Sequence, residues 1–213
     1  MVNLKSSYSS IVEDGFTSQM EISFIEDGKK QTLLYQKVFW DIAGEKKGLR
    51  YGENPGQPAA LYKPINGNLI LGEVKMLEAG NHLASDLELL QSGKHPGKIN
   101  IADADAALNI LKYFQETPCC VIIKHNNPCG VAKSDTIESS YSKALYADRI
   151  AAFGGAVAIN RKIDEATARK IVENYHEVII APDFDQKALD LFKSKKNLRV
   201  MKIENMKKLQ TYI

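Results

Sequence analysis

The feature that most constrains this chain is a regular alternation of strand and helix patterns after residue 100. Short apolar runs rich in Val, Ile and Ala are separated by segments whose apolar residues recur at helical spacing. We expect strands at 121–123, 156–159, 177–181 and 198–203, and helices at 101–116, 136–147, 165–175 and 186–193. Such alternation requires crossover connections, so the sequence predicts an α/β fold with a mainly parallel sheet and right-handed crossovers.

The starts of these helices carry capping residues. Asn100 is the expected N-cap of the first helix, and Asp164 is the expected N-cap of the third. Asp103 and Asp105 fall near the start of the first helix, where carboxylates favour the positive end of the helix dipole. We therefore expect these two carboxylates to stabilise the helix and to take no part in chemistry.

The first hundred residues carry hairpin signals instead. Asp-Gly at 27–28 and Asn-Gly at 66–67 are strong turn signals, and the segments around them alternate apolar and polar side chains. Two pairs of segments are expected to form hairpins: 20–26 with 31–39, and 59–62 with 69–74. Two stretches are expected to be connections without strands: 40–48 and 77–98. Residues 1–18 lack a strong period and predict a loosely held lead-in segment.

The sequence CCVIIKHNNPCG at 119–130 contains the central strand of this pattern. Lys124 and His125 follow its apolar run, at the carboxyl end, where open α/β sheets place their ligands. Asn-Asn-Pro at 126–128 and Gly130 then predict an irregular, rigid polar loop. Histidine takes up a proton near neutral pH, so His125 is a candidate acid or base. The alternative is a structural loop in which His125 only hydrogen-bonds a backbone carbonyl.

A second candidate lies in LRYGENPGQ at 49–57, whose Gly, Asn and Pro residues exclude a long helix or a central strand. This segment holds Arg50 and Tyr51 on irregular backbone. The guanidinium group offers a planar set of donors suited to phosphate, and the phenol adds a hydroxyl for the same group. An ordinary turn with a surface Arg explains the same spacing, so both interpretations stay open at this point.

Charge, hydropathy and cysteine content exclude several classes of protein. A net charge of +2 gives no reason to expect nucleic acid or a membrane surface as partner. We see no apolar run long enough to cross a bilayer, and the polar N-terminus does not resemble a signal peptide. Cys119, Cys120 and Cys129 make a poor disulfide framework and suit a reducing cytoplasm. No Cys-x-x-Cys or His-x-x-x-His spacing occurs, so we expect a cytoplasmic protein without a catalytic metal.

Five motifs now indicate a family. They occur in order across nearly the whole chain: LRYGENPGQPAALY at 49–62, IADADAAL at 101–108, IIKHNNPCGVA at 122–132, DRIAAFGGAVAIN at 148–160 and EVIIAP at 177–182. Together they resemble the formyltransferase domain of the bifunctional purine-biosynthesis family AICAR transformylase/IMP cyclohydrolase. That domain consists of two cytidine-deaminase-like layered α/β units. The resemblance implies that residues 19–213 are the first unit, preceded by the lead-in at 1–18.

The resemblance implies formyl transfer in purine biosynthesis. The 5-amino group of AICAR, the aminoimidazole carboxamide ribonucleotide, attacks the formyl group of 10-formyltetrahydrofolate and gives FAICAR. The lone pair of that amine is delocalised into the imidazole, so a base and an oxyanion-stabilising cation are needed. His125 matches the catalytic His of the family and is expected to transfer the proton. Lys124 matches the neighbouring Lys, which has an electrostatic role and tunes the His.

Other positions match family residues that contact the substrates. They are Arg50, Tyr51, Gly154 and Glu177 for the nucleotide, and Ile150 and Phe153 for the folate. The resemblance implies that the first two hold the nucleotide chiefly at its phosphate. It also implies that the loop at 153–154 meets both the folate and the aminoimidazole.

The chain departs from the family pattern in two places and lacks two parts of it. Gly56 stands where the family commonly has His, and GKHPGKIN at 93–100 stands where GKELSYNN is usual, which puts local binding or dimer contacts in doubt. We find no counterpart of the IMP cyclohydrolase domain or of the second unit, which supplies a catalytic Asn. We therefore expect that the chain is either a fragment of a longer protein or a natural half, and that activity needs a complementary C-terminal polypeptide. A homo- or hetero-oligomer is also expected, because the family site forms between two subunits.

Two other hypotheses remain beside this one. The chain could be a non-catalytic nucleotide- or folate-binding subunit that keeps the scaffold, although such a subunit has no need of Lys124, His125, Arg50 and Tyr51 together. A zinc deaminase needs a His-x-Glu and a Pro-Cys-x-x-Cys. Pro128 and Cys129 are present, but residue 132 is Ala and two Asn residues follow His125, so the sequence argues against that chemistry.

Overall fold

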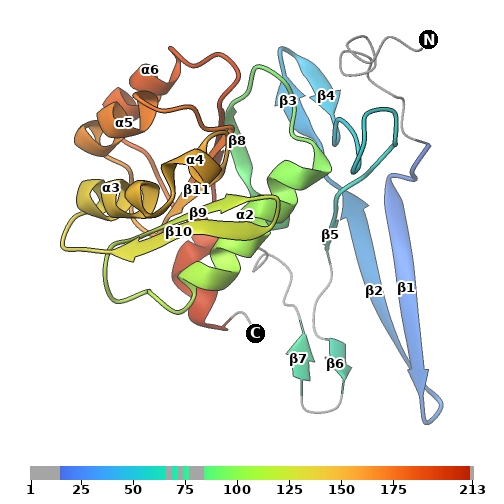
Figure 1. Ribbon diagram of the computed structural model, residues 1–213. Helices are drawn as coiled ribbons and strands as arrows, with labels where there is room; N and C mark the ends of the chain where they lie inside the picture. Colours follow the sequence, from blue (N-terminus) through green and yellow to red (C-terminus); the bar gives the residue numbers. More distant parts are fainter. Residues whose placement is uncertain (1–14, 66–68, 72–73, 77–83, 212–213) are drawn as a thin grey trace.

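The computed structural model describes residues 15–65, 69–71, 74–76 and 84–211 (Figure 1). Its centre is a six-stranded sheet with the order β10-β9-β11-β12-β13-β8. The strands are β8 (Glu88–Gln91), β9 (Cys119–Lys124), β10 (Asn127–Lys133), β11 (Ala156–Ile159), β12 (Val178–Ala181) and β13 (Arg199–Lys202). Every residue of β11 and β12 is buried, as expected for strands that are covered on both faces.

The sheet is mixed, and most of its strands share one direction. β12 pairs in parallel with β11 and β13, whereas β9 is antiparallel to both β10 and β11, and β8 is antiparallel to β13. Four strands of the six, β10 to β13, therefore run the same way, and the predicted α/β class with a mainly parallel sheet is confirmed. β9, the second strand from one edge, runs the opposite way, because a tight turn rather than a crossover connects it to β10, and β8 at the other edge does so too.

The segment after β9 differs from the irregular loop that the sequence predicts. Residues 127–133 form β10, with a bulge between Pro128 and Gly130. β10 lies at one edge of the sheet, where the absent N–H of a proline is tolerated. Gly130 is needed for packing as well, because a Cβ atom there would lie 1.9 Å from the carbonyl oxygen of Ala144.

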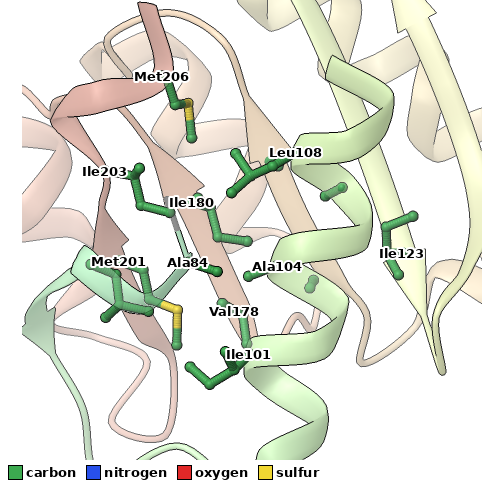
Figure 2. Close-up of a cluster of buried hydrophobic side chains, with 14 of the residues drawn as sticks. Ala84, Ile101, Ala104, Leu108, Ile123, Val178, Ile180, Met201, Ile203 and Met206 are labelled. Carbon is green, nitrogen blue, oxygen red and sulfur yellow. The ribbon is translucent and has the colours of Figure 1, made fainter. Parts of the chain in front are cut away.

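Helices cover both faces of the sheet (Figure 1). α2 (Lys98–Leu111) lies on one face, and α3 (Ile137–Ala147), α4 (Arg149–Ala152), α5 (Glu165–Val172) and α6 (Gln186–Phe192) lie on the other. Figure 2 shows Ile101, Ala104 and Leu108 of α2 directed at Val178 and Ile180 of the sheet. Alternate residues of β9 enter the two cores, because successive side chains of a strand point to opposite faces.

α2 begins earlier than the sequence predicts. Its N-cap is Gly97, and Asn100 occupies the third helical position. The side-chain oxygen of Asn100 reaches back to accept the N–H of Gly97 at 3.0 Å, so Asn100 satisfies the helix start from inside the helix. Asp103 consequently lies beyond the first turn, where the helix has no unpaired N–H group for it to accept. α5, the helix expected at 165–175, begins as predicted: the side chain of its N-cap Asp164 accepts the N–H of Thr167 at 2.8 Å.

The N-terminal part contains one of the two predicted hairpins, the one turned at Asp27-Gly28, whereas the predicted pairing of 59–62 with 69–74 is wrong because each segment pairs with a different strand. β1 (Gln19–Glu26) and β2 (Lys29–Lys37) are joined by Asp27 and Gly28, with φ of 47° and 74°. β5 (Tyr62–Pro64) pairs with β2 as the third strand. β6 (Leu69–Leu71) pairs with β7 (Val74–Met76) where one strand was predicted, and the turn expected at Asn66-Gly67 lies outside the described residues.

Two predicted connections contain strands. β3 (Trp40–Ile42) and β4 (Glu45–Lys47) form a hairpin within 40–48, turned at Ala43 and Gly44 with φ of 56° and 82°. β8 lies within 77–98, of which 77–83 is outside the described residues, and it follows a 3-10 helix at Ala84–Asp86. A second 3-10 helix, Glu204–Thr211, follows β13. None of the helices in the described ranges combines the length and apolar character that a bilayer crossing requires.

Candidate functional site

The candidate residues gather along one side of the sheet, where strands β8 and β9 end and strands β11, β12 and β13 begin. Ile123 near the end of β9 pairs with Ala156, the first residue of β11, and the starts of β12 and β13 follow in register. Lys124 therefore does lie at the carboxyl end of its own strand. Strands β10 to β13 run the opposite way to β9, so their amino ends lie on this side of the sheet. The rule that places ligands at the carboxyl ends of parallel strands does not locate this site.

Lys124 and His125 stand at the tip of the β9–β10 hairpin. His125 and Asn126 form its two-residue turn, with φ of 53° and 62°. Consecutive left-handed residues are typical of the type I′ turn, which matches the twist of antiparallel strands. This conformation is uncommon for residues other than Gly, although Asn and His adopt it more often than most. The turn leaves the imidazole of His125 exposed beyond the edge of the sheet.

The side chain of Lys124 joins this turn to the loop before β11. Its Nζ donates to the carbonyl oxygen of Phe153 at 2.6 Å. Gly154 follows in the left-handed region, with φ of 75°, and its N–H donates to the carbonyl oxygen of Tyr175 at 2.8 Å. The rings of Phe153 and Tyr175 pack with their centroids 5.0 Å apart. Three predicted residues, Lys124, Phe153 and Gly154, are thus brought together.

Residues of α4, of this loop and of the segment before β12 line a pocket of about 470 Å³. Ile150 and Phe153 line it and are 89% and 62% exposed. Its wall also includes Tyr175 and His176, which no sequence motif marked. His176 is buried, its Nε2 lies 2.8 Å from the hydroxyl of Tyr141, and burial lowers its pKa to about 4. The imidazole of His176 is therefore neutral at physiological pH.

Glu177 occupies the same edge, directly before β12. Its N–H donates to the carbonyl oxygen of Gly155 at 3.1 Å, and its carboxylate accepts from the side-chain amide of Asn100 at 3.3 Å. Arg199, the first residue of β13, lies 3.9 Å from the same carboxylate. Arg199 is only 6% exposed, and its Nε donates to the carbonyl oxygen of Lys94 at 3.1 Å. Burial lowers the pKa of Arg199, and Glu177 opposes that shift.

Arg50 and Tyr51 are fastened to the segment that leads into α2. The N–H of Arg50 donates to the carbonyl oxygen of Pro96 at 2.9 Å, and the N–H of Lys98 donates to that of Tyr51 at 3.0 Å. The guanidinium group of Arg50 donates to the Tyr51 hydroxyl at 2.6 Å and lies 4.4 Å from the centre of its ring. Arg50 is half-buried, in contrast to the surface Arg of the alternative interpretation.

His95 belongs to this cluster, although no motif marked it. It is 5% exposed, and its Nδ1 donates to the carbonyl oxygen of Gly48 at 2.7 Å. Burial lowers the pKa of His95, while the charges of Arg50 and Arg199 act in the same direction. Within the described part of the chain, Nε2 of His95 and Nε of Arg50 are buried without a hydrogen-bond partner. Of the described residues around the Arg50–Tyr51 segment, Arg50 thus leaves a donor unpaired, and His95, whose Nδ1 donates to Gly48, leaves an acceptor unpaired.

Asp103 is placed differently from the helix-stabilising role that the sequence predicts. Its carboxylate accepts the N–H of Asn126 at 2.7 Å, across from α2 to the β9–β10 turn. Asp103 is 7% exposed, and burial raises its pKa although the backbone N–H groups of Asn126 and His125 lower it. The prediction was wrong because α2 begins at Lys98, which moves Asp103 away from the helix end and toward the turn.

The three cysteines belong to the β9–β10 hairpin. Cys119 and Cys120 are buried in β9, Cys129 is half-buried in β10, and all three are free. Burial raises the pKa of the Cys119 thiol to about 11 and raises that of Cys120 as well. Across the described ranges, no three His, Cys, Asp or Glu side chains come together as a metal site would require.

These observations define a mixed α/β protein whose polar site lies at one sheet edge, between a Lys-His turn, a half-buried Arg-Tyr segment and a buried Arg beside Glu177. A family model described as the AICARFT/IMPCHase bienzyme matches residues 3–212, and the chain belongs to this family. Three relatives carry the name bifunctional purine biosynthesis protein PurH. The chain spans about a third of the length of these curated relatives, 30% to 37%.

The relatives are similar along most of the chain. The Persephonella marina protein is 47% identical over 198 residues, covering 84% of this chain and 36% of its own length. The Caldicellulosiruptor saccharolyticus protein is 44% identical over 164 residues, covering 77% and 30%. The Clostridium perfringens protein is 37% identical over 211 residues, covering 99% and 37%. A solved structure, Acinetobacter baumannii RibD, matches 53% of this chain and 38% of its own at 13% identity and a TM-score of 0.40, which is too distant to argue from.

Proposed function

We propose that this chain carries the His–Lys part of an AICAR formyltransferase. It would transfer the formyl group of 10-formyltetrahydrofolate to the 5-amino group of AICAR, together with a complementary C-terminal polypeptide. Membership of the AICARFT/IMPCHase family and the purine-biosynthesis relatives support this reaction. The observation that carries the proposal is the contact between Lys124 Nζ and the Phe153 carbonyl at 2.6 Å, which joins the proposed catalytic turn to the proposed substrate loop.

The chemistry needs a base and a cation at neighbouring positions. The amine nitrogen of AICAR attacks the formyl carbon, and the bond from that carbon to the folate N10 breaks. His125 takes the amine proton as the new bond forms, and N10 leaves with the bonding electrons and takes up a proton. Lys124 stabilises the negative charge that develops on the formyl oxygen. An ammonium group has three donors, so the contact with Phe153 leaves two of them for the substrate.

The other contacts would hold the two substrates. Arg50 and Tyr51 would bind the nucleotide chiefly at its phosphate, since their donors lie beside the amino-terminal turn of α2. Gly154 would let the backbone approach the aminoimidazole, and Glu177 would contact the nucleotide from the start of β12. The folate would lie against Ile150 and Phe153, which are exposed at the rim of the 470 Å³ pocket.

The proposal extends to the organisation of the chain. Residues 19–213 would be the first cytidine-deaminase-like unit of the formyltransferase domain, and residues 1–18 a lead-in segment. The helices on both faces of the sheet support a layered unit of this kind. A second unit would supply the remaining catalytic Asn, so the working form would be a homo- or hetero-oligomer in the cytoplasm.

Reconstitution tests this proposal. The purified chain would be assayed for formyl transfer to AICAR, alone and with the C-terminal formyltransferase segment of the Persephonella marina relative added as a separate polypeptide. Turnover in the mixture is the expected result, and production of FAICAR would be followed by chromatography. AICAR binding by calorimetry without turnover in the mixture would contradict the enzyme proposal and support the binding-subunit hypothesis.

A further inference from the structure

The turn that carries His125 is anchored from another element. Asp103 projects from α2, and its carboxylate accepts the backbone N–H of Asn126 at 2.7 Å. Because Asp103 is 7% exposed, water competes little for this bond, and a carboxylate makes it stronger than a neutral acceptor would.

The backbone of this turn has a particular need for an anchor. His125 and Asn126 are both in the left-handed region, which few residues other than Gly occupy, although Asn and His adopt it more often than most. Lys124 and Asn127 close the turn as a register pair, so the conformation of two residues alone decides where the imidazole points. On the far side of the turn the ladder is interrupted by the bulge between Pro128 and Gly130. Strand pairing therefore holds the turn less firmly on the β10 side.

We propose that Asp103 is a positioning residue for His125: by accepting the N–H of Asn126 it fixes the turn that presents the imidazole to the substrate amine. Asp103 does not touch the reacting atoms and acts through the backbone of the turn. This inference rests on the proposed formyltransferase function, because the importance of the direction of the imidazole depends on its role as the base.

The chain offers a matched set of variants. Asp103→Leu keeps the branched shape of the side chain but replaces both acceptor oxygens with bulkier methyl groups, whereas Asp103→Asn keeps the volume and one neutral acceptor. Asp105→Asn is the control, since Asp105 lies on the same helix, is also partly buried and accepts from the side chain of Asn109 at 3.3 Å. Two measurements are made on each protein: kcat and KM in the reconstituted assay, and hydrogen exchange of the Asn126 amide by NMR in the chain itself.

The expected result separates positioning from folding. In Asp103→Leu, kcat falls by about 10²-fold, because a displaced base loses its alignment, while KM for AICAR stays within about twofold. The Asn126 amide exchanges about tenfold faster than in the unchanged protein. Asp103→Asn restores part of both values because its amide oxygen still accepts one N–H. Asp105→Asn leaves both values unchanged.

Other results would overturn the inference. One is an Asp103→Leu protein whose kcat and Asn126 exchange both match those of Asp105→Asn; another is a faster exchange without loss of kcat. If Asp103→Leu does not fold, Asp103→Asn decides by the same comparison with Asp105→Asn. An inactive mixture of unchanged polypeptides would contradict the proposed function, and the exchange rates would still show whether Asp103 holds the turn. Unchanged exchange in that case would overturn the anchor as well.

Discussion

Ile123 of β9 and Ala156 of β11 are register partners in an antiparallel pair. This pairing brings the end of β9 to the start of β11, and it places the Lys-His turn beside the loops that precede β11 and β12. Had β9 run parallel to β11, the turn would lie at the opposite edge, away from Gly154 and Glu177. The direction of one strand thus decides which of the candidate residues can act together.

Replacing His125 tests the proposed base. We expect His125→Asn to lower kcat of the reconstituted enzyme by about 10² to 10⁴-fold, because general-base catalysis contributes that much. Asn is chosen because it accepts the left-handed φ of 53° at this position, so the turn is kept. The control is Lys133→Gln, at the other end of the same hairpin, which should keep full activity. Turnover of His125→Asn within threefold of that control would refute the assignment.

Replacing Lys124 tests the proposed oxyanion stabilisation. In the Lys124→Gln variant the side-chain amide can still donate to the Phe153 carbonyl but carries no charge, so the loop contact is largely retained. We expect kcat to fall by about 10² to 10³-fold, as for removal of an oxyanion donor, with a smaller change in KM. Steady-state kinetics against Lys133→Gln measures this. A change confined to KM would instead assign Lys124 to substrate binding.

Arg199 should contribute to stability as well as to the site. Arg199→Met would remove one of the two donors to the Lys94 carbonyl, which also accepts the Ser92 hydroxyl, and would leave Glu177 without its nearby cation. We expect the free energy of unfolding to fall by about 1–3 kcal/mol, the cost of a buried group that loses its partner. Arg169→Met is the control, because its ion pair with Glu165 is 62% exposed on the Arg side and such pairs contribute about 0–1 kcal/mol. Urea unfolding that ranks the two variants equally would contradict this expectation.

His176 should make the fold sensitive to acid. Its pKa is lowered from 6.5 to about 4 by burial, so the unfolded chain binds this proton more tightly than the folded one. Stability is therefore full above about pH 6.5 and is lost as the pH falls toward 4, by about 3 kcal/mol for this group. We expect His176→Gln, which can still hydrogen-bond Tyr141, to lose less stability over that range. Urea unfolding at pH 7.5, 6 and 5 compares the two proteins, and identical pH dependence would exclude His176 as the cause.

Local patterns in the sequence were sufficient for much of the fold. β11 coincides with the predicted strand at 156–159, and the Asp27-Gly28 turn joins β1 to β2. α5 begins directly after Asp164, as its capping residue predicts. Each of these features depends on residues that are close in the sequence, so propensity and turn chemistry decide them. The family could be recognised for a similar reason, since its motifs are short and contiguous.

The sequence by itself therefore determined the α/β class, most strand and helix positions after residue 100, and the residues that resemble a formyltransferase site. Only the tertiary structure decided the reversed direction of β9, the strand β10 where a loop was expected, and the placement of Asp103 and Arg199 around the candidate residues. The physical reason is that strand direction and burial depend on contacts between residues far apart in the chain. An Asp in a helix pattern looks the same whether its carboxylate stabilises the helix end or accepts the N–H of a distant turn.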